Sequence, residues 1–289
     1  ITICGRPNVG KSTLTNALAG EKIAIVSNKP QTTRNRITAV CQRGETQFVF
    51  LDTPGFHKPR TRLGDYMVNV VRQSVADVDA VVLVVEPVAS LGPQERELIA
   101  SIKAANCPAV LAINKLDTVE PEKLLAVIAL YSEAYAFNAI VPISAKTGDG
   151  VEELLKELDK FAVESPALFP EGVTTDQPEK QVCAELIREK LLLNLEREVP
   201  HGTAVEITRF SEREDGMIDL DATIYCEKNS HKGIIIGKGG AMLKKISTLA
   251  RTDIEAFMGT KVFLQTWVKV KEKWRDSNSL LRNFGYTDT

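Results

Sequence analysis

Short apolar runs alternate with amphipathic stretches over the first 165 residues. Runs rich in Val and Ile that are too short for helices predict strands at Ile1–Cys4, Ile37–Cys41, Gln47–Leu51, Ala80–Val85, Ala109–Ile113 and Ile140–Ile143. Apolar residues recur at helical spacing in Ser12–Leu18, Gln94–Ala104, Pro121–Ala136 and Val151–Phe161. Because strands that alternate with helices need crossover connections, the pattern predicts an α/β domain with a mostly parallel sheet and helices on both faces.

A second pattern begins after a stretch with the composition of a linker, in which Pro166, Pro170, Gly172 and Pro178 follow one another closely. The elements that we then expect are helix Gln181–Glu196, strands Thr203–Phe210 and Met217–Cys226, an apolar run at Ile234–Ile236, helix Ala241–Met258, strand Val262–Val270 and a short helix at Asp276–Phe284. This α+β order differs from the first pattern. The sequence therefore predicts two domains, 1–165 and 180–289, joined by a linker at 166–179.

Composition narrows the class of protein without deciding its function. The chain is 44% hydrophobic and 26% charged, as in soluble globular proteins, and has no apolar stretch long enough to span a membrane. The five cysteines are far apart and include no CxxC pair, which predicts reduced, mostly buried thiols in a cytosolic protein and argues against a zinc site. Because the sequence starts inside a predicted strand, we expect the native N-terminus to lie upstream of Ile1.

The formal net charge of −2 conceals a basic segment between Lys228 and Arg275. That segment holds eleven lysines and arginines against three acids, which gives it a local net charge of +8. Such a block can be a solvated surface or the electrostatic footprint of a domain that binds nucleic acid.

The octapeptide GRPNVGKS at 5–12 follows a predicted strand and opens a predicted helix. It fits GxxxxGK[ST], a loop whose backbone N–H groups surround phosphate oxygens at a positively polarised helix start. Lys11 would neutralise the β- and γ-phosphates, and the Ser12 hydroxyl is a hard ligand suited to Mg²⁺. The nucleotide contacts expected in this region are Asn8, Val9, Gly10, Lys11, Ser12 and Thr13.

Two further segments add candidate residues near the γ-phosphate. DTPG at 52–55 ends a predicted strand, and open α/β sheets bind ligands at the carboxyl ends of their strands. Asp52 can hold Mg²⁺ through water, and the Gly55 N–H can contact the γ-phosphate. A threonine of the preceding loop can give Mg²⁺ a second hydroxyl, with Thr33 preferred and Thr32 as the alternative. The expected catalytic set is Lys11, Thr33, Asp52 and Gly55, and the expected Mg²⁺ ligands are Ser12, Thr33 and Asp52.

The tetrapeptide NKLD at 114–117 is expected to select the base. Asp117 would accept hydrogen bonds from guanine N1–H and N2–H₂, donors that adenine lacks, and such charge-assisted bonds contribute roughly 1.5–3 kcal/mol each. Lys115 would lie along the base plane, and Asn114 would tie the loops together. The segment Ser144, Ala145 and Lys146 follows another predicted strand and can present a backbone N–H to guanine O6.

Two residues bear on how hydrolysis proceeds. Phe56 stands after Gly55, where Ras-like enzymes carry the glutamine that orients the attacking water. Since a phenyl ring cannot hydrogen-bond water, intrinsic hydrolysis should be slow and should rest on charge neutralisation. In related GTPases with this loop sequence, an asparagine at the place of Asn8 helps to bind K⁺; the alternative is an asparagine that only braces the loop.

The run Ile236, Gly237, Lys238, Gly239 and Gly240 places a GxxG motif between an apolar segment and a basic helix. This is the arrangement of a KH module, whose GxxG loop clamps about four nucleotides of a single strand. Lys238, Lys244 and Lys245 would add phosphate contacts. The two adjacent strands before the motif indicate the type II arrangement.

Together these motifs resemble the Era family of bacterial GTPases. The resemblance rests on GRPNVGKS, QTTR, DTPG, NKLD, SAK, IIGKGG, WVKVK and NFGY, and it runs over essentially the whole chain. It implies a P-loop GTPase domain followed by a type II KH domain, with GTP or GDP and Mg²⁺ as ligands. It further implies a cytoplasmic factor that binds near the 3′ end of 16S rRNA, acts in assembly of the small (30S) ribosomal subunit and associates loosely with the membrane. We expect a monomer.

Two other classes of protein remain to be weighed. One is an RNA-binding module with a vestigial nucleotide domain, which the full set of Lys11, Ser12, Asp52 and Asp117 disfavours. The other is a membrane-remodelling or tRNA-modifying GTPase, which would carry long amphipathic helices or extra catalytic residues that this sequence lacks.

Overall fold

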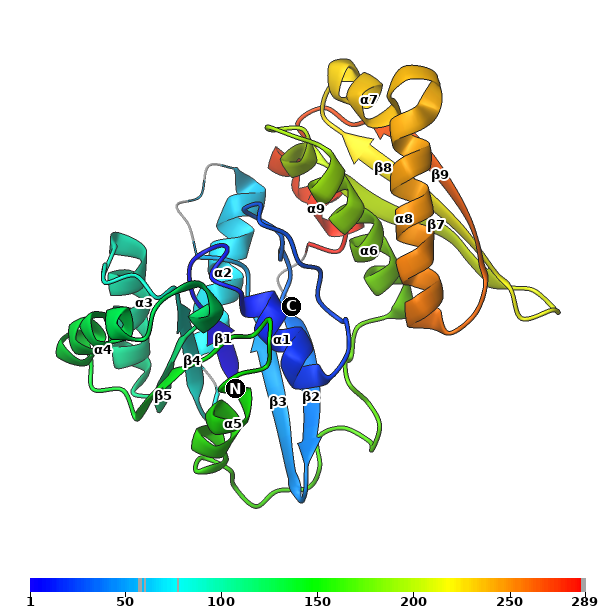
Figure 1. Ribbon diagram of the computed structural model, residues 1–289. Coiled ribbons are helices and arrows are strands. Elements are labelled where there is room, and N and C mark those ends of the chain that lie inside the picture. The colour runs from blue at the N-terminus through cyan, green and yellow to red at the C-terminus, as the bar shows by residue number, and fades with distance from the viewer. Residues whose placement is uncertain (57–58, 60, 77, 287–289) are drawn as a thin grey trace. The chain divides into compact units, whose positions relative to one another are not determined.

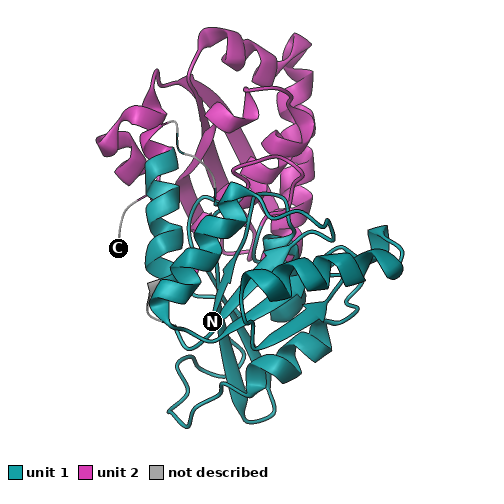
Figure 2. Cartoon of the chain, turned by 90° about the vertical axis from the view of Figure 1, so that its left-hand side faces the viewer, with its two compact units in different colours: residues 1–24, 33–60, 64–176 teal, residues 25–32, 61–63, 177–289 magenta. Residues whose placement is uncertain are grey.

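The chain forms two compact units, shown in Figure 2. The structure is a computed structural model that describes residues 1–56, 59, 61–76 and 78–286. Unit 1 comprises Ile1–Ala24, Thr33–Arg60 and Gly64–Asp176, and unit 2 comprises Ile25–Thr32, Thr61–Leu63 and Gln177–Thr289. The main division falls inside the predicted linker. Two short segments from the first part of the chain nevertheless group with unit 2.

Unit 1 is built on a six-stranded sheet with the strand order β2-β3-β1-β4-β5-β6 (Figure 1). Its strands are β1 (Thr2–Cys4), β2 (Ile37–Arg43), β3 (Thr46–Asp52), β4 (Val81–Val85), β5 (Ala109–Ile113) and β6 (Ala139–Pro142). β2 pairs antiparallel with β3, and the other neighbouring strands pair in parallel. The prediction of a mostly parallel sheet is therefore confirmed.

Helices cover both faces of this sheet, as the sequence predicts. They are α1 (Lys11–Ala19), α2 (Arg62–Ala76), α3 (Pro93–Ala105), α4 (Glu122–Ala134) and α5 (Val151–Asp159), with a 3₁₀ turn at Leu116–Thr118. Side chains of α1 and α5 share one apolar cluster with Val82 and Val84 of β4. Side chains of α2, α3 and α4 share the other with Val81 and Leu83, because successive residues of a strand point to opposite faces.

The predicted elements do not include α2. Its buried residues Leu63, Met67, Val71 and Val75 recur every four positions, which is helical spacing. This spacing is present in the sequence itself, although the valines on this face are weak helix formers. Packing of the buried face against the sheet decides the conformation.

Unit 2 contains a three-stranded sheet with the order β7-β8-β9, in which β7 and β8 are antiparallel and β8 and β9 are parallel. Its elements are α6 (Glu179–Asn194), β7 (Ala204–Glu212), β8 (Ile218–Cys226), α7 (Asn229–Ile236), α8 (Ala241–Met258), β9 (Val262–Val270) and α9 (Asn278–Asn283), with 3₁₀ turns at Pro200–Gly202, Lys238–Gly240 and Trp274–Asp276. The predicted order of elements is confirmed. The apolar run Ile234–Ile236 proves to be the end of helix α7.

Part of the predicted linker is bound along unit 1. The Thr174 carbonyl accepts the Val40 N–H at 2.7 Å, and the Thr175 hydroxyl donates to the Thr38 carbonyl at 2.7 Å. Residues 174 and 175 thus lie alongside the outer edge of β2.

The five cysteines are free thiols, and all except Cys41 are buried, as predicted. Burial raises the pKa values of Cys4 and Cys183 to about 12, so neither is a nucleophile near neutral pH. Among the residues that the structure describes, no helix is long and apolar enough to cross a membrane.

Candidate functional site

The loop between β1 and α1 has the geometry of an anion site. Helix α1 begins at Lys11 and has no side-chain cap, so the N–H groups of its first turn face the loop. The preceding residue, Gly10, has φ +98°, and a Cβ there would lie 2.2 Å from Asn114 Nδ2. Glycine is therefore required at this position both by the backbone conformation and by the close approach of Asn114.

Lys11 folds back into the loop that precedes it. Its Nζ donates to the Gly5 carbonyl at 3.1 Å and to the Arg6 carbonyl at 2.9 Å. Burial lowers the pKa of Lys11, and the nearby Asp52 carboxylate offsets that effect only in part. An anionic phosphate at this position would supply the counter-charge that the buried ammonium needs.

Ser12, Thr33 and Asp52 converge although they lie far apart in the sequence. Ser12 Oγ lies 2.7 Å from Thr33 Oγ1 and donates to Asp52 Oδ2 at 2.8 Å. The second carboxylate oxygen, Asp52 Oδ1, is buried with no hydrogen-bond partner in the described part of the chain. Burial raises the pKa of Asp52 to about 6, against the opposing effect of Lys11. Two hydroxyls and an unsatisfied buried carboxylate are a donor set that fits Mg²⁺.

The structure separates the two candidate threonines. Thr33 is buried beside Ser12, whereas Thr32 Oγ1 lies 2.7 Å from Ser27 Oγ and donates to the Lys29 carbonyl at 2.7 Å. Thr33 is therefore the one whose hydroxyl reaches the cluster.

The DTPG segment packs tightly on the phosphate loop. A Cβ on Gly55 would lie 2.7 Å from Pro7 Cα, and the Phe56 N–H donates to the Gly5 carbonyl at 3.2 Å. The Phe56 ring is 5% exposed and packs in the apolar cluster that includes Val68 and Leu98. Its side chain thus serves the core and cannot orient a water molecule.

The NKLD and SAK segments are joined by side-chain hydrogen bonds. Asn114 Nδ2 donates to the Val9 carbonyl at 2.8 Å, while Asn114 Oδ1 accepts the Ala145 N–H at 2.9 Å, so this residue ties the phosphate loop to the SAK segment. Ser144 Oγ donates to Asp117 Oδ1 at 2.7 Å and orients the carboxylate. Lys146 and Asn8 are exposed, and Thr13 is half-buried.

Sequence reasoning missed a charged network beside these motifs. Arg6 lies 3.7 Å from Glu86 and also pairs with the buried carboxylate of Glu95, and Lys115 pairs with Glu86. Glu86 thus bridges the phosphate loop and the base-selecting loop. The sequence could have indicated Glu86 by its position directly after β4, at the same carboxyl edge of the sheet as Asp52 and Asn114.

In unit 2, the GxxG motif forms a tight turn between α7 and α8. A Cβ on Gly237, which has φ +73°, would lie 2.7 Å from Met242 Cβ, so the turn itself requires this glycine. Gly239 and Gly240 also have positive φ values, but a Cβ on either would meet nothing within 4 Å. The outer side of the turn is therefore open to the close approach of a ligand backbone.

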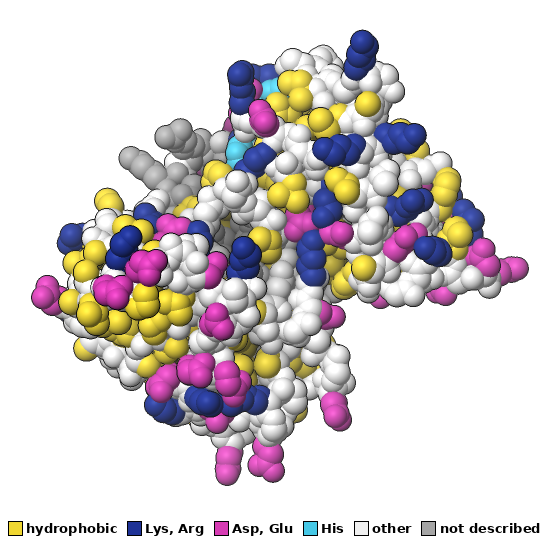
Figure 3. Space-filling model, viewed as in Figure 1, with side chains coloured by type: hydrophobic (Ala, Val, Ile, Leu, Met, Phe, Trp, Pro, Cys, Tyr) yellow, Lys and Arg dark blue, Asp and Glu magenta, His cyan; other side chains and the backbone are white. Residues whose placement is uncertain are grey.

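Basic side chains surround this turn. Lys238, Lys244 and Lys245 are exposed, and Ile236 is half-buried at the end of α7. In Figure 3, several Lys and Arg side chains are visible on the face of unit 2 that carries α8. Three lysines of the +8 segment, Lys238, Lys244 and Lys245, thus lie within or just after the GxxG turn, where a clamp for a phosphate backbone needs positive charge.

The fold and the site define a P-loop protein of the guanine-nucleotide-binding class that carries a C-terminal KH domain. The family model described as 50S ribosome-binding GTPase matches residues 1–115, and the KH domain model matches residues 198–275. GTPase Era of Ruminiclostridium cellulolyticum is 53% identical over 286 residues, which cover 99% of this chain and 96% of that protein. GTPase Era of Clostridioides difficile is 48% identical over 290 residues, which cover 100% and 98%.

Solved structures agree with these sequence matches. A variant of Aquifex aeolicus Era bound to GDP·AlF₄⁻ is 37% identical with a TM-score of 0.95, and the match covers 99% of this chain and 98% of that chain. A structure of Era in complex with MgGDPNP and nucleotides 1506–1542 of 16S ribosomal RNA matches with the same identity, coverage and TM-score. The chain belongs to the Era family of GTPases. The alternative of a vestigial nucleotide domain is thereby set aside.

Proposed function

We propose that this GTPase binds 16S rRNA near its 3′ end and acts as a GTP-controlled factor in assembly of the small (30S) ribosomal subunit. The observation that carries the proposal is the presence, in one chain, of the Ser12–Thr33–Asp52 cluster and the open GxxG turn of unit 2. The Era structure with MgGDPNP and nucleotides 1506–1542 of 16S rRNA supports the choice of RNA.

In the nucleotide site, we assign Ser12, Thr33 and Asp52 to Mg²⁺ and Lys11 to the β- and γ-phosphates. When bound, Mg²⁺ neutralises charge that develops on the phosphate oxygens during transfer. The backbone of 8–13 surrounds the phosphates, and the Gly55 N–H lies on the side of the γ-phosphate. Asp117 accepts from guanine, Lys115 flanks the base, and the backbone of 144–146 reaches guanine O6.

In unit 2, we propose that the turn at 236–240 contacts the sugar–phosphate chain of the RNA. Lys238, Lys244 and Lys245 would bind its phosphates. The two open glycines of the turn support this assignment. Contacts with phosphates set affinity and its salt dependence, while bases beside the turn set sequence preference.

The test is crosslinking of the full-length protein to total cellular RNA, in Mg²⁺ with either GDPNP or GDP, followed by sequencing of the crosslinked RNA. We expect reads concentrated at the 3′ end of 16S rRNA, with a higher yield in GDPNP. Reads that spread over all RNAs in proportion to their abundance would contradict the proposal, since they would indicate binding by charge alone.

We also propose that K⁺ assists hydrolysis at Asn8, because this side chain is exposed on the phosphate loop and carries an amide oxygen that can coordinate a cation. Hydrolysis by the purified protein should then be several-fold faster in K⁺ than in Na⁺ at equal ionic strength. The Asn8→Asp variant provides the control, since a carboxylate retains a hard oxygen donor. Equal rates in the two salts would leave Asn8 as a loop-bracing residue.

A monomeric state, a cytoplasmic location and a loose, peripheral association with the membrane complete the proposal. They rest on the family resemblance and not on any contact in the structure.

A further inference from the structure

Arg6 of the phosphate loop is held by a carboxylate from a different part of unit 1. Its guanidinium pairs with Glu95, the third residue of helix α3, whose side chain is only 3% exposed. The other carboxylate near Arg6 belongs to Glu86, lies 3.7 Å away and is more exposed, so solvent screens that pair more strongly. Glu95 is therefore the partner that fixes the position of the Arg6 side chain.

The buried place of Glu95 is built into the start of helix α3. Glu95 lies in the first turn, where the positively polarised end of the helix favours a carboxylate. Gly92 leaves room for that carboxylate, because a Cβ on Gly92 would lie 2.8 Å from Glu95 Oε2. With φ −78°, Gly92 has a backbone conformation that any residue can adopt. The close approach of Glu95 is thus what excludes a side chain at this position.

The pair of Glu95 and Arg6 is poorly suited to stabilising the fold. Glu95 Oε2 is buried and has no hydrogen-bond partner among the residues that the structure describes, and an unsatisfied buried carboxylate oxygen costs free energy. Pairing with an arginine that is 36% exposed offsets only part of that cost. Replacement of such a pair by apolar side chains is often neutral or stabilising. A role other than stability would account for the buried carboxylate.

The backbone of Arg6 contacts groups that we assign to the nucleotide phosphates. Its carbonyl oxygen accepts a hydrogen bond from Lys11 Nζ at 2.9 Å. The next residue, Pro7, lies so close to Gly55 that a Cβ on Gly55 would be 2.7 Å from Pro7 Cα. Because Arg6 and Pro7 share a planar peptide group, a displacement of Arg6 would move both the acceptor of Lys11 and the surface on which Gly55 packs.

We propose that Glu95 is a positioning residue, which acts through Arg6 and holds the phosphate loop in the conformation that binds the nucleotide. The inference rests on the proposed role of Lys11 at the β- and γ-phosphates. Without Glu95, the loop adopts more conformations, and the nucleotide must restrict them when it binds. Because GTP and GDP both carry a β-phosphate, the affinity for both nucleotides should fall while the fold is kept.

The test compares nucleotide affinity with thermal stability in the full-length chain. Glu95→Met should weaken the binding of GDP and of GDPNP, each measured with Mg²⁺ by calorimetry, roughly tenfold, near the lower end of what loss of a hydrogen bond to a charged group costs. The unfolding temperature without nucleotide should stay the same or rise, because the variant removes the unsatisfied buried oxygen and lets Arg6 reach solvent. Glu95→Gln keeps an oxygen that can accept a hydrogen bond from Arg6, so it should lose less affinity than Glu95→Met.

The matched control is Glu97→Met on the same helix. It removes a carboxylate that is 52% exposed and pairs with Arg72 at 3.1 Å, so it should change neither affinity. A double-mutant cycle tests whether Glu95 acts through Arg6. In an Arg6→Met background, Glu95→Met should have no further effect on either affinity.

Unchanged affinities in Glu95→Met, a loss of affinity that comes with a lower unfolding temperature, or a Glu95 effect of full size in the Arg6→Met background would each overturn the inference. Lys11→Ala separates these results from a failure of the proposed nucleotide site. If Lys11→Ala loses binding while Glu95→Met does not, Lys11 keeps its role and only the inference fails. If Lys11→Ala binds both nucleotides as tightly as the wild type, the role of Lys11 fails and the inference fails with it.

Discussion

The Asp117→Asn variant should bind GTP roughly 10²–10⁴-fold more weakly than the wild type and should prefer xanthosine triphosphate. In the proposed role, the carboxylate would accept two hydrogen bonds from guanine, and together these would contribute roughly 3–6 kcal/mol. An asparagine places an NH₂ group where an acceptor is needed, opposite guanine N2–H₂. Xanthine carries a carbonyl at that carbon, so the same NH₂ group finds an acceptor there. Calorimetric titration of the wild type and of Asp117→Asn with GTP, ATP and xanthosine triphosphate measures this change in nucleotide preference.

The matched control is Asp149→Asn, the same isosteric change at an exposed carboxylate that accepts from the Thr147 hydroxyl at 2.7 Å. It should leave the order of affinities unchanged. Ser144→Ala should lower the affinity for GTP only moderately, because it removes the 2.7 Å hydrogen bond that orients Asp117 but leaves the carboxylate in place. Wild-type protein that binds ATP as tightly as GTP would contradict the assignment of Asp117 to the base.

Most of the fold and the separate pieces of the site could be predicted because they obey local rules. The β4 and β5 runs are short, apolar and bounded by turn residues, which predicts buried strands there. Each nucleotide motif follows a strand, and strands that run in parallel bring their carboxyl ends to one edge. Spacing in the sequence is then enough to expect that Asp52 and Asn114 approach the phosphate loop.

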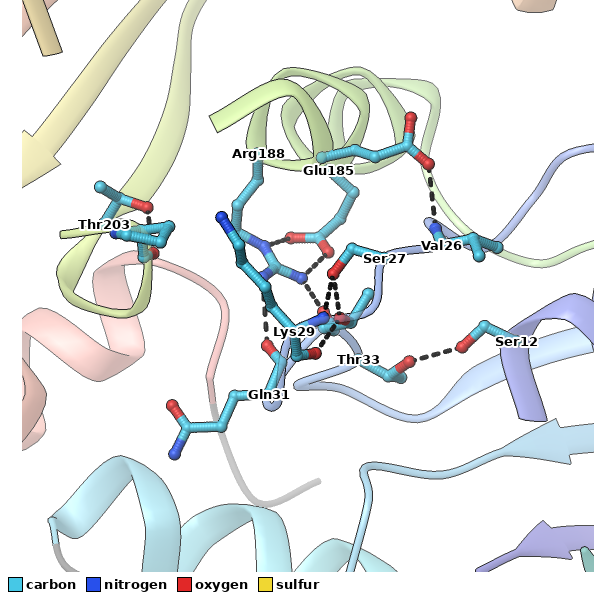
Figure 4. A network of polar contacts seen from close by, with 12 residues as sticks. Ser12, Val26, Ser27, Lys29, Gln31, Thr33, Glu185, Arg188 and Thr203 are labelled. Atoms are coloured by element: carbon cyan, nitrogen blue, oxygen red, sulfur yellow. Dashed lines mark hydrogen bonds and ion pairs between the residues drawn. The ribbon is translucent and has the colours of Figure 1, made fainter. Parts of the chain in front are cut away.

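What could not be predicted depends on contacts distant in sequence. Glu86 and Glu95 carry no motif, and only the folded sheet shows that both pair with Arg6. The choice of Thr33 over Thr32 likewise needs the hydroxyl positions, since either residue fits the pattern. The grouping of Ile25–Thr32 with unit 2 depends on contacts with residues more than 150 positions away, among them the buried Arg188 (Figure 4), and no periodicity in the loop itself indicates them.

Local sequence patterns and contacts distant in sequence contribute differently to the nucleotide site. The groups that we assign to the phosphates lie at strand ends and at a helix start, whereas Thr33, which we propose responds to the γ-phosphate, lies on an irregular loop. An irregular loop has more conformational freedom, so the order that the site needs must be supplied by partners outside the motif.

Combined replacement of Lys238 and Gly239 by Asp should lower affinity for single-stranded RNA by at least about a hundredfold at physiological salt. The change removes one positive charge and adds two negative ones at the turn that would face the phosphate chain. Asp tolerates positive φ better than most residues, and a Cβ on Gly239, with φ +59°, would meet nothing within 4 Å, so the turn should keep its fold. Titration of labelled RNA at several salt concentrations measures both the affinity and its salt dependence.

The control with the same charge change is Lys261→Asp combined with Gly216→Asp, at the opposite end of β8. Gly216 also has a positive φ and open space around its Cα, and Lys261 is 79% exposed, so folding should be equally unaffected. Because this pair lies away from the GxxG turn, it should weaken binding only slightly, through the long-range field that salt screens. If both double variants lose affinity to the same extent, RNA responds to the total charge of unit 2, and the GxxG turn has no special part in the binding.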